Sequence, residues 1–274
     1  MSFFAILFAG KVGAVEASHL KLTVQELYLR WGITEAEQTH SRPPPTLSDL
    51  LRLLRDNAER HADEARRLCS RNLATHLEAA LLGPVGVLDG QTNVDLTSHL
   101  VCFDLKSLEP GSFQLFMFVV LDFIEQRMYE DPARPKACYI DESWILLENE
   151  VTARALSQMN RHTRHVNMGI DFITQTPDSF FQSPSGEAIR LTCAQTLLFR
   201  QETVSDRTRH GYGLDDAEAG LLMRLSKADQ GGFSQALYIT GDTKAHIAIF
   251  AAPSEAELAT TRPEDLARRK GVTA

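Results

Sequence analysis

The sequence has little of several features that would place it in a specialised class of protein. Its 274 residues include only four cysteines, and no two of them form a C-x-x-C pair, so neither a disulfide framework nor a zinc site is predicted. Cys102 and Cys138 lie inside apolar runs and are expected to be buried thiols. The apolar run within residues 1–11 is too short to span a bilayer, and no positive charge precedes it. We expect it to form a helix or strand packed on the core.

Positive charge is also scarce. The chain has 28 Lys and Arg against 36 Asp and Glu, a formal net charge of −8. Passive binding of nucleic acid through a basic surface needs clustered cations that displace counterions, and this balance disfavours it. A ring with a basic lumen remains compatible with the composition, so direct contact with nucleic acid stays an open question at this point.

Hydrophobic residues make up 43% of the chain, which is enough for a sizeable core. The first region, residues 1–97, is predicted to be all helix. Apolar residues recur at helical spacing from Leu20 to Trp31, and Thr46 with Asp49 resembles a capping box that opens a second helix. A third helix is expected over residues 61–82, ending before Gly83 and Pro84.

The second region, residues 98–274, is predicted to be α/β. Short apolar runs that end in polar residues alternate with helical segments, a pattern typical of buried parallel strands. Strands are expected at residues 100–105, 136–142, 169–175 and 196–200, and helices at 113–129 and 148–165. Residues 235–240 and 245–250 flank Gly241-Asp242 and predict a hairpin that extends the sheet antiparallel.

Polar side chains follow two of these strands where ligands bind in open α/β sheets. Asp141 and Glu142 stand in the Walker B arrangement, in which the first acid holds Mg²⁺ through water and the second orients or deprotonates the attacking water. Gln175 could sense a γ-phosphate or position that water. The alternatives are that the acids end a strand and cap a helix, and that Gln175 satisfies a turn.

Three arginines are further candidates. Arg200 closes an apolar run and could reach a phosphate, or it could be a solvated surface charge. Arg161 and Arg164 lie in a basic helix end together with His162 and His165. Because cations are favoured at helix C-termini, that cluster is structural by default, and no metal site is predicted there.

Taken together, several segments resemble the VirB-four (TraC/CagE-like) ATPases of type IV secretion, in the HerA/FtsK branch of P-loop NTPases. The resemblance extends from about Leu20 to Pro253, and its most specific segments are Ile-Asp-Glu-x-Trp and Thr-Gln. The segments that carry it are Pro45-Thr46-Leu47-Ser48-Asp49-Leu50, Asp89-Gly90-Gln91-Thr92-Asn93-Val94-Asp95-Leu96, Phe103-Asp104-Leu105, Tyr139-Ile140-Asp141-Glu142-Ser143-Trp144, Ile173-Thr174-Gln175 and Phe199-Arg200-Gln201.

The resemblance implies a RecA-like core preceded by an all-α insert, with ATP and Mg²⁺ as ligands. It implies that Asp141 and Glu142 form the Walker B pair and that Gln175 contacts the γ-phosphate or its water. Arg161, Arg164 or Arg200 would be an arginine finger reaching the next subunit of a homo-hexamer. It further implies a cytoplasmic position at the inner membrane, secretion-system partners and a protein or nucleoprotein substrate. Ser143 stands where the family usually has Ala.

The sequence departs from the family at the phosphate-binding loop. It contains no G-x-x-x-x-G-K-[ST], and the nearest candidate, Gly10-Lys11, is followed by Val12 with no Gly five residues before Gly10. We therefore expect the first strand and this Walker A loop to be missing, as in a fragment, a split gene or a degenerate paralogue. The chain alone is predicted to be inactive. The alternatives are a DNA-pumping motor of the same superfamily and a non-catalytic docking module of a secretion complex.

Overall fold

The computed structural model describes residues 2–8, 10–93, 98–105, 108, 110–227 and 232–260. The chain divides into two compact units. The helical unit comprises residues 1–134 with 154–156, and the α/β unit comprises residues 135–153 with 157–274. The division by contacts therefore groups residues 98–134 with the helices, whereas the sequence pattern places the boundary at residue 97.

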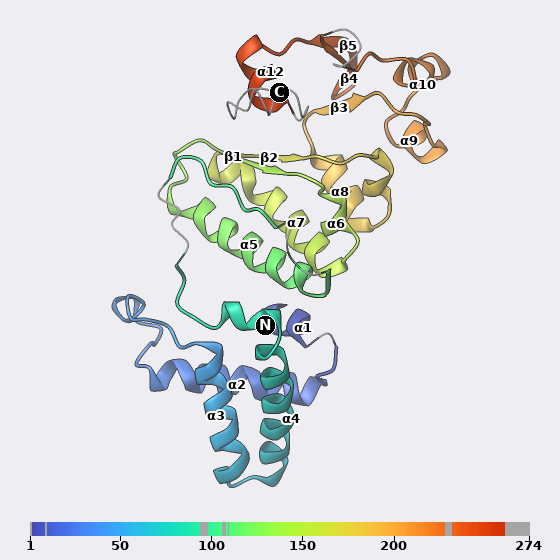
Figure 1. Cartoon of the computed structure of the whole chain (residues 1–274). Helices are drawn as coiled ribbons and strands as arrows, with labels where there is room; N and C mark the ends of the chain where they lie inside the picture. Colours follow the sequence, from blue (N-terminus) through green and yellow to red (C-terminus); the bar gives the residue numbers. More distant parts are fainter. Residues whose placement is uncertain are drawn as a thin grey trace, which may run out of the picture. The chain divides into compact units, whose positions relative to one another are not determined.

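The helical unit contains five α-helices and two 3₁₀ turns within its described residues. They are α1 (Ser2–Leu7), α2 (Ala14–Arg30), η1 (Glu37–Thr39), α3 (Leu47–Arg60), α4 (Glu64–Leu81), η2 (Pro84–Leu88) and α5 (Pro110–Glu130). Helices α2, α3 and α4 pack on one another, and α1 contacts α5 (Figure 1). The three helices expected before residue 83 are confirmed. No helix in the described part of the chain combines the length and the apolar character needed to cross a membrane.

One apolar core holds the helical unit together. Leu20 of α2, Leu54 of α3 and Leu73 and Leu77 of α4 are at most 1% exposed. Phe8, just after α1, joins the same cluster, so the prediction that the N-terminal run packs on the core is confirmed. Burial of this apolar area is the main term that stabilises such a bundle.

Polar groups inside this bundle have partners. His19 Nε2 lies 2.7 Å from Ser70 Oγ, in a buried hydrogen bond between α2 and α4. Thr46 caps α3: its side chain accepts from the backbone N–H of Asp49, and the Asp49 carboxylate accepts from the backbone N–H of Thr46 at 2.8 Å. The predicted capping box is therefore confirmed, with Asp in place of the usual Glu.

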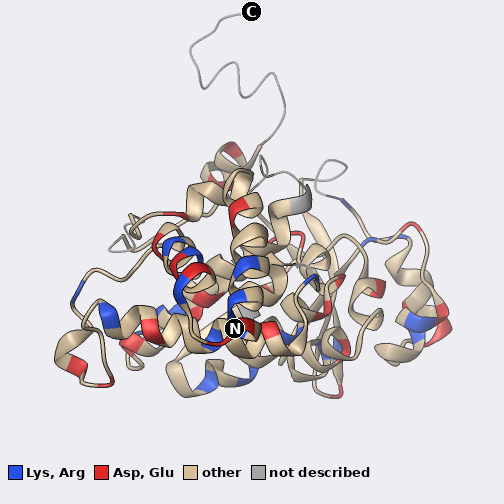
Figure 2. Ribbon diagram, turned by 90° about the horizontal axis from the view of Figure 1, so that it is seen from below, with Lys and Arg blue, Asp and Glu red and all other residues tan. Residues whose placement is uncertain are grey.

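Basic and acidic residues are mixed along the same helices rather than separated into faces of one sign (Figure 2). Arg30 pairs with Glu26 one turn away on α2, and Arg55 of α3 pairs with Glu78 of α4, both at 2.6 Å. Exposed pairs of this kind contribute little stability. In these two pairs, each cation lies beside an acidic side chain.

The α/β unit contains five strands in its described residues. They are β1 (Lys136–Ile140), β2 (Met168–Phe172), β3 (Thr196–Phe199), β4 (Ser234–Thr240) and β5 (Thr243–Ile249). The helical elements are α6 (Trp144–Leu147), α7 (Glu150–His162), η3 (Thr163–Val166), η4 (Pro177–Phe181), α8 (Pro184–Thr192), α9 (Asp206–Gly211), α10 (Asp216–Leu222) and α12 (Pro253–Ala259). The expected α/β class with a preceding helical region is confirmed.

The strands form two sheets instead of one mostly parallel sheet. Strands β1 and β2 pair in parallel, with Cys138 opposite Ile170. Strands β3, β4 and β5 form an antiparallel sheet. The expected hairpin is confirmed, because β4 and β5 are joined by two residues and Gly241 has φ +54°, a conformation that favours glycine. However, β3 pairs with β4. Among the described residues, it forms no strand pairing with β1 or β2.

Side chains that follow the strands tie the two sheets together. The Asp178 carboxylate in η4, after β2, accepts hydrogen bonds from Ser205 and Thr208 around α9, after β3, at 2.5 and 2.6 Å. The Arg190 guanidinium of α8 lies over the Phe181 and Tyr212 rings, 5.0 and 5.4 Å from their centroids. Burial raises the pKa of Tyr212 to about 12, so this phenol stays neutral in the cluster.

The strand expected at residues 100–105 is wrong. These residues form no regular strand, and the side chains of Leu100 and Val101 are 85% and 37% exposed. A strand needs a hydrogen-bonded neighbour, and the described residues provide none for this run. Cys102 is exposed accordingly, contrary to expectation. Cys138 in β1 is half-buried, and burial raises the pKa of its thiol to about 11.

Candidate active site

Two turns at the carboxyl ends of β1 and β2 are held together by backbone hydrogen bonds. The backbone N–H of Ile173 donates to the carbonyl of Ile140, and the N–H of Ser143 donates to the carbonyl of Ile173, both at 2.9 Å. The parallel ladder therefore continues past the last strand residues into both turns. This extension brings the residues that follow β1 next to those that follow β2.

Ser143 strengthens this junction. Its side chain is fully buried, and its hydroxyl donates a second hydrogen bond to the Ile173 carbonyl at 2.9 Å. A carbonyl oxygen has two lone pairs, and here one residue occupies both of them. An alanine at this position could not form the second bond. Sequence reasoning missed this role, because a serine in a turn has many uses.

Glu142 lies at the centre of the site in an uncommon backbone conformation. Its φ is +48°, in the left-handed region, where a residue with a Cβ is strained. The Asp141 carboxylate accepts a hydrogen bond from the Glu142 backbone N–H at 2.9 Å, so this N–H has a partner within the turn. Asp141 is exposed, and Glu142 is half-buried. The turn thus projects two carboxylates at the end of β1.

Gln175 reaches the Glu142 side chain across the junction. Its amide Nε2 donates to Glu142 Oε1 at 2.6 Å. The other carboxylate oxygen, Oε2, accepts a hydrogen bond from the Trp144 indole N–H at 2.5 Å. The structure therefore brings together Asp141, Glu142 and Gln175, as expected from the strand ends. Trp144 ends the Ile-Asp-Glu-x-Trp segment, but the sequence alone indicated no role for it.

Arg161 and Arg164 lie away from these residues. Both are exposed, at the end of α7 and in η3, just before β2 begins. The carboxylates and Gln175 lie where β1 and β2 end. Five strand residues at about 3.3 Å each separate the two ends by about 16 Å. Within one chain these arginines do not reach the site; their assignment as fingers toward a neighbouring subunit stays a prediction.

Arg200 follows β3, in the antiparallel sheet, and is half-buried. The next residue, Gln201, donates its backbone N–H to the carbonyl of Leu222 at 3.1 Å, which fixes the chain direction after the strand. Asp178 and its two hydrogen bonds link this segment to the turn after β2. Arg200 therefore belongs to the same unit as Glu142, and its finger role also stays a prediction.

The donor set fits Mg²⁺ only in part. Among the described residues no three acidic, His or Cys side chains converge, so this part of the chain offers no complete metal cage. Mg²⁺ characteristically keeps several waters and takes one or two carboxylates together with substrate phosphates. The exposed Asp141 carboxylate suits that mode of binding. The sequence contains no Walker A loop, whose backbone amides would cradle the phosphates of a nucleotide.

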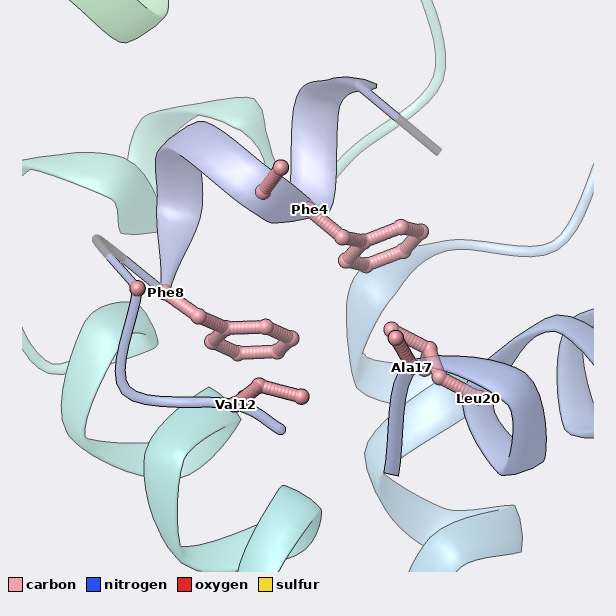
Figure 3. A pocket seen from close by; sticks show the side chains of 7 residues that line it. Phe4, Phe8, Val12, Ala17 and Leu20 are labelled. Carbon is pink, nitrogen blue, oxygen red and sulfur yellow. The ribbon is translucent and has the colours of Figure 1, made fainter. Parts of the chain in front are cut away.

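A separate cavity of about 390 Å³ lies in the helical unit, between α1 and α2 (Figure 3). The Phe4 and Phe8 rings stack on one side of it, with centroids 5.9 Å apart. Its lining carries no titratable side chain, so it has no means of acid–base or metal chemistry. The lining residues are Phe4, Ala5, Phe8, Gly10, Val12, Ala17 and Leu20.

Comparison with solved structures tests the fold as a whole. VirB4 of Thermoanaerobacter pseudethanolicus aligns with 93% of this chain and 68% of its own, with a TM-score of 0.76 and 24% sequence identity. The chain has the fold of VirB4. This confirms the expected RecA-like α/β architecture with its helical region.

Other comparisons add less. The plasmid coupling protein TrwB, solved in complex with the non-hydrolysable GTP analogue GDPNP, aligns with 91% of this chain and 67% of its own. Its TM-score is 0.47 and its identity 13%. No protein-family model and no curated protein sequence matches the chain.

Proposed function

We propose that this chain is the water-activating part of a motor ATPase of type IV secretion or conjugation. The observation that carries the proposal is the Glu142 carboxylate, 2.6 Å from the Gln175 amide at the adjoining ends of two parallel strands. The VirB4 fold supports it. A strand end of a phosphate-transferring α/β protein is where such a pair orients the attacking water.

Each residue has a distinct role in the proposed reaction. Glu142 accepts a proton from the water that attacks the γ-phosphorus of ATP, and Gln175 fixes the position of that water or of the γ-phosphate. Asp141 holds Mg²⁺ through its water shell. When bound, Mg²⁺ neutralises charge on the phosphate oxygens. Ser143 positions Glu142 indirectly, because it fastens the turn that carries Glu142 to the turn that carries Gln175.

The proposed assembly follows the resemblance. A homo-hexamer at the cytoplasmic face of the inner membrane would place an arginine of one subunit at the nucleotide of the next. It would couple hydrolysis to transport of a protein or nucleoprotein substrate, or to pilus assembly, together with other secretion components. Phosphate binding needs the Walker A amides and lysine, so this function requires a polypeptide segment beyond the present sequence.

Steady-state ATP hydrolysis tests the proposal. The 274-residue chain should show no turnover above background, because it lacks the groups that cradle the phosphates. A chain extended upstream through an in-frame Walker A loop should hydrolyse ATP. Glu142→Gln in the extended chain should abolish that activity, and Glu148→Gln, an exposed glutamate in the same unit, should not. Turnover by the 274-residue chain that Glu142→Gln abolishes would overturn the requirement for the loop.

A non-catalytic docking module is the second candidate, and the lack of a Walker A motif in the sequence favours it. It predicts that no extension restores hydrolysis and that Glu142→Gln leaves assembly of the secretion complex unchanged. Measuring both quantities on the same variants separates the two functions.

A further inference from the structure

The turn that carries Gln175 is closed by hydrogen bonds between its own residues. Thr174 Oγ1 lies 2.9 Å from Ser179 Oγ, and the Ser179 hydroxyl donates to the carbonyl of Thr176 at 2.6 Å. Ser179 is buried, with 3% exposure, so these bonds are partly shielded from water. Gln175 lies inside this closed turn and reaches Glu142 through its terminal amide. The position of the Gln175 backbone therefore depends on the position of the whole turn.

Asp178 ties the closed turn to α9, which follows the antiparallel strand β3. One oxygen of its carboxylate, Oδ1, accepts from the Ser205 hydroxyl at 2.5 Å and from the Thr208 hydroxyl at 2.6 Å. Ser205 is the N-cap of α9, and its side chain also accepts from the backbone N–H of Thr208. Thr208 is 2% exposed. Because hydrogen bonds to an ionised acceptor are stronger than those between neutral groups, Asp178 is a firm anchor for the turn.

The far end of η4 is fixed to the far end of the same helix. The Phe181 ring lies edge-on to the Tyr212 ring, with centroids 5.8 Å apart. A Cβ on Gly211 would lie 2.2 Å from the Phe181 ring, so this ring packs directly against the backbone of α9. The Gly211 carbonyl accepts from Arg190 Nη1 at 2.7 Å. Helix α9 thus holds η4 at both ends, and Asp178 forms the end that adjoins the closed turn.

We propose that Asp178 is the positioning residue for Gln175. It holds the closed turn on α9 at the place from which the Gln175 amide meets the Glu142 carboxylate. Asp178 is the third residue after Gln175, so a shift of η4 on α9 moves the amide with it. The consequence for catalysis rests on the proposed ATPase function. A misplacement of about 1 Å in a group that orients a reactant lowers the rate strongly, and Asp178 acts on the rate only through the turn.

The side-chain amide signals of Gln175 test this role in the 274-residue chain without nucleotide. They are the pair missing from the nitrogen-15 NMR spectrum of Gln175→Ala, and Glu142→Ala gives their position when the carboxylate contact is lost. Asp178→Ala should move the pair toward that position, because the turn loses its anchor. Asp178→Asn should leave the pair near its parent position, since an amide oxygen has two lone pairs and accepts both hydroxyls. A pair that stays at the parent position in Asp178→Ala would overturn the proposal.

Thr208→Val is a milder variant for the case in which Asp178→Ala does not fold. It keeps the shape of a buried side chain and removes one of the two hydroxyls that donate to Asp178. The Gln175 signals should move in the same direction as in Asp178→Ala, by a smaller amount. The control is Asp242→Ala, which removes an exposed acid from the turn between β4 and β5 and should leave the signals unchanged. Equal shifts in Thr208→Val and Asp242→Ala would overturn the role of the anchor.

The kinetic consequence is measured in the extended, loop-containing chain. Asp178→Ala should lower kcat by about tenfold and change KM by less than about twofold, because Gln175 acts on the attacking water. Asp178→Asn should restore most of kcat. A lower melting temperature with an unchanged kcat per folded molecule would show a role in stability alone and overturn the positioning role. If neither the parent nor any variant hydrolyses ATP while the Gln175 signals behave as expected, the proposed function fails and the positioning of Gln175 by Asp178 stands.

Discussion

The helical unit and the α/β unit differ in how completely their hydrogen-bonding groups are paired. In the helical unit the buried His19 pairs with Ser70, and a capping box closes the start of α3. In the α/β unit the parallel pair has no third strand among the described residues, and Glu142 adopts a left-handed backbone. Strain of this kind persists where function requires it. We therefore expect the helical unit to contribute mainly to stability and the α/β unit to carry the proposed chemistry.

The largest expected effect separates the two carboxylates of the α/β unit in the loop-containing chain. Glu142→Gln keeps size and polarity but removes the proton acceptor, so turnover should fall by about 10² to 10⁴ while ATP still binds. Asp141→Asn should in addition raise the Mg²⁺ concentration needed for half-maximal rate, because that acid acts through the metal. Titrating Mg²⁺ against the rate for each variant distinguishes the roles.

Asp56→Asn serves as the matched control in the helical unit, since Asp56 is an acid in an exposed pair with Arg60. It should leave both rate and Mg²⁺ dependence unchanged. If it changed them as much as Asp141→Asn, the assignment of chemistry to the α/β unit would be wrong.

The arginines are expected to act between subunits. An arginine finger is worth about 10³ or more in rate and adds little to nucleotide affinity. Arg200→Ala, Arg161→Ala or Arg164→Ala should therefore lower turnover with nucleotide binding nearly unchanged. Mixing the responsible variant with Glu142→Gln subunits should restore part of the activity, because some interfaces of a mixed ring are intact on both sides.

Rescue of activity by mixing subunits is the measurement that decides whether an arginine acts as a finger between subunits. Arg161 and Arg164 lie before the start of β2, a strand about 16 Å long, and the carboxylates lie near its far end, so an effect of these two without rescue would contradict the geometry. Full activity in all three variants would show that these arginines are helix-end and surface charges and not fingers.

Among the described residues β1 and β2 pair only with each other, and we expect these edges to cause self-association. Unpaired backbone groups along a strand edge template pairing with another chain, and Tyr139 in β1 is 70% exposed. Light scattering after size exclusion should show species above the monomer at high concentration. Tyr139→Lys should reduce them, since edge lysines oppose pairing. Leu82→Lys, at an 85% exposed site of the helical unit, should not; a clean monomer for the parent chain would contradict the prediction.

The sequence predicted those features that depend on short stretches of chain. Apolar spacing and Thr46 predicted α2, α3 and α4, and Gly241-Asp242 predicted the hairpin. The approach of Gln175 to Glu142 also followed, because the ends of neighbouring parallel strands meet at one edge. Pattern alone could not predict which strand β3 would pair with, or that residues 100–105 would stay unpaired, since pairing depends on partners distant in sequence.

The smallest expected effect lies in the helical unit, at the cap of α3. Thr46→Ala removes the hydroxyl that accepts from the Asp49 N–H and should lower the free energy of unfolding by about 1 kcal/mol. Thr75→Ala in the middle of α4 is the control: Thr75 is exposed, and alanine favours helix, so stability should not fall. Denaturant unfolding followed by circular dichroism measures both.

The pH dependence of this cap has a definite sign. Burial of the Asp49 carboxyl raises its pKa, but hydrogen bonds from Thr46 and the neighbouring Arg52 guanidinium outweigh burial and leave the pKa below its usual value. A lowered folded-state pKa stabilises the protein above the unfolded pKa of about 3.9, and this contribution is lost as pH falls through the folded value. Thr46→Ala removes one of the lowering hydrogen bonds, so the gap in stability between the two proteins should be largest at neutral pH and shrink below about pH 4. A gap that stayed constant down to pH 2 would show that the cap acts through the backbone of α3 alone and not through the charge of Asp49.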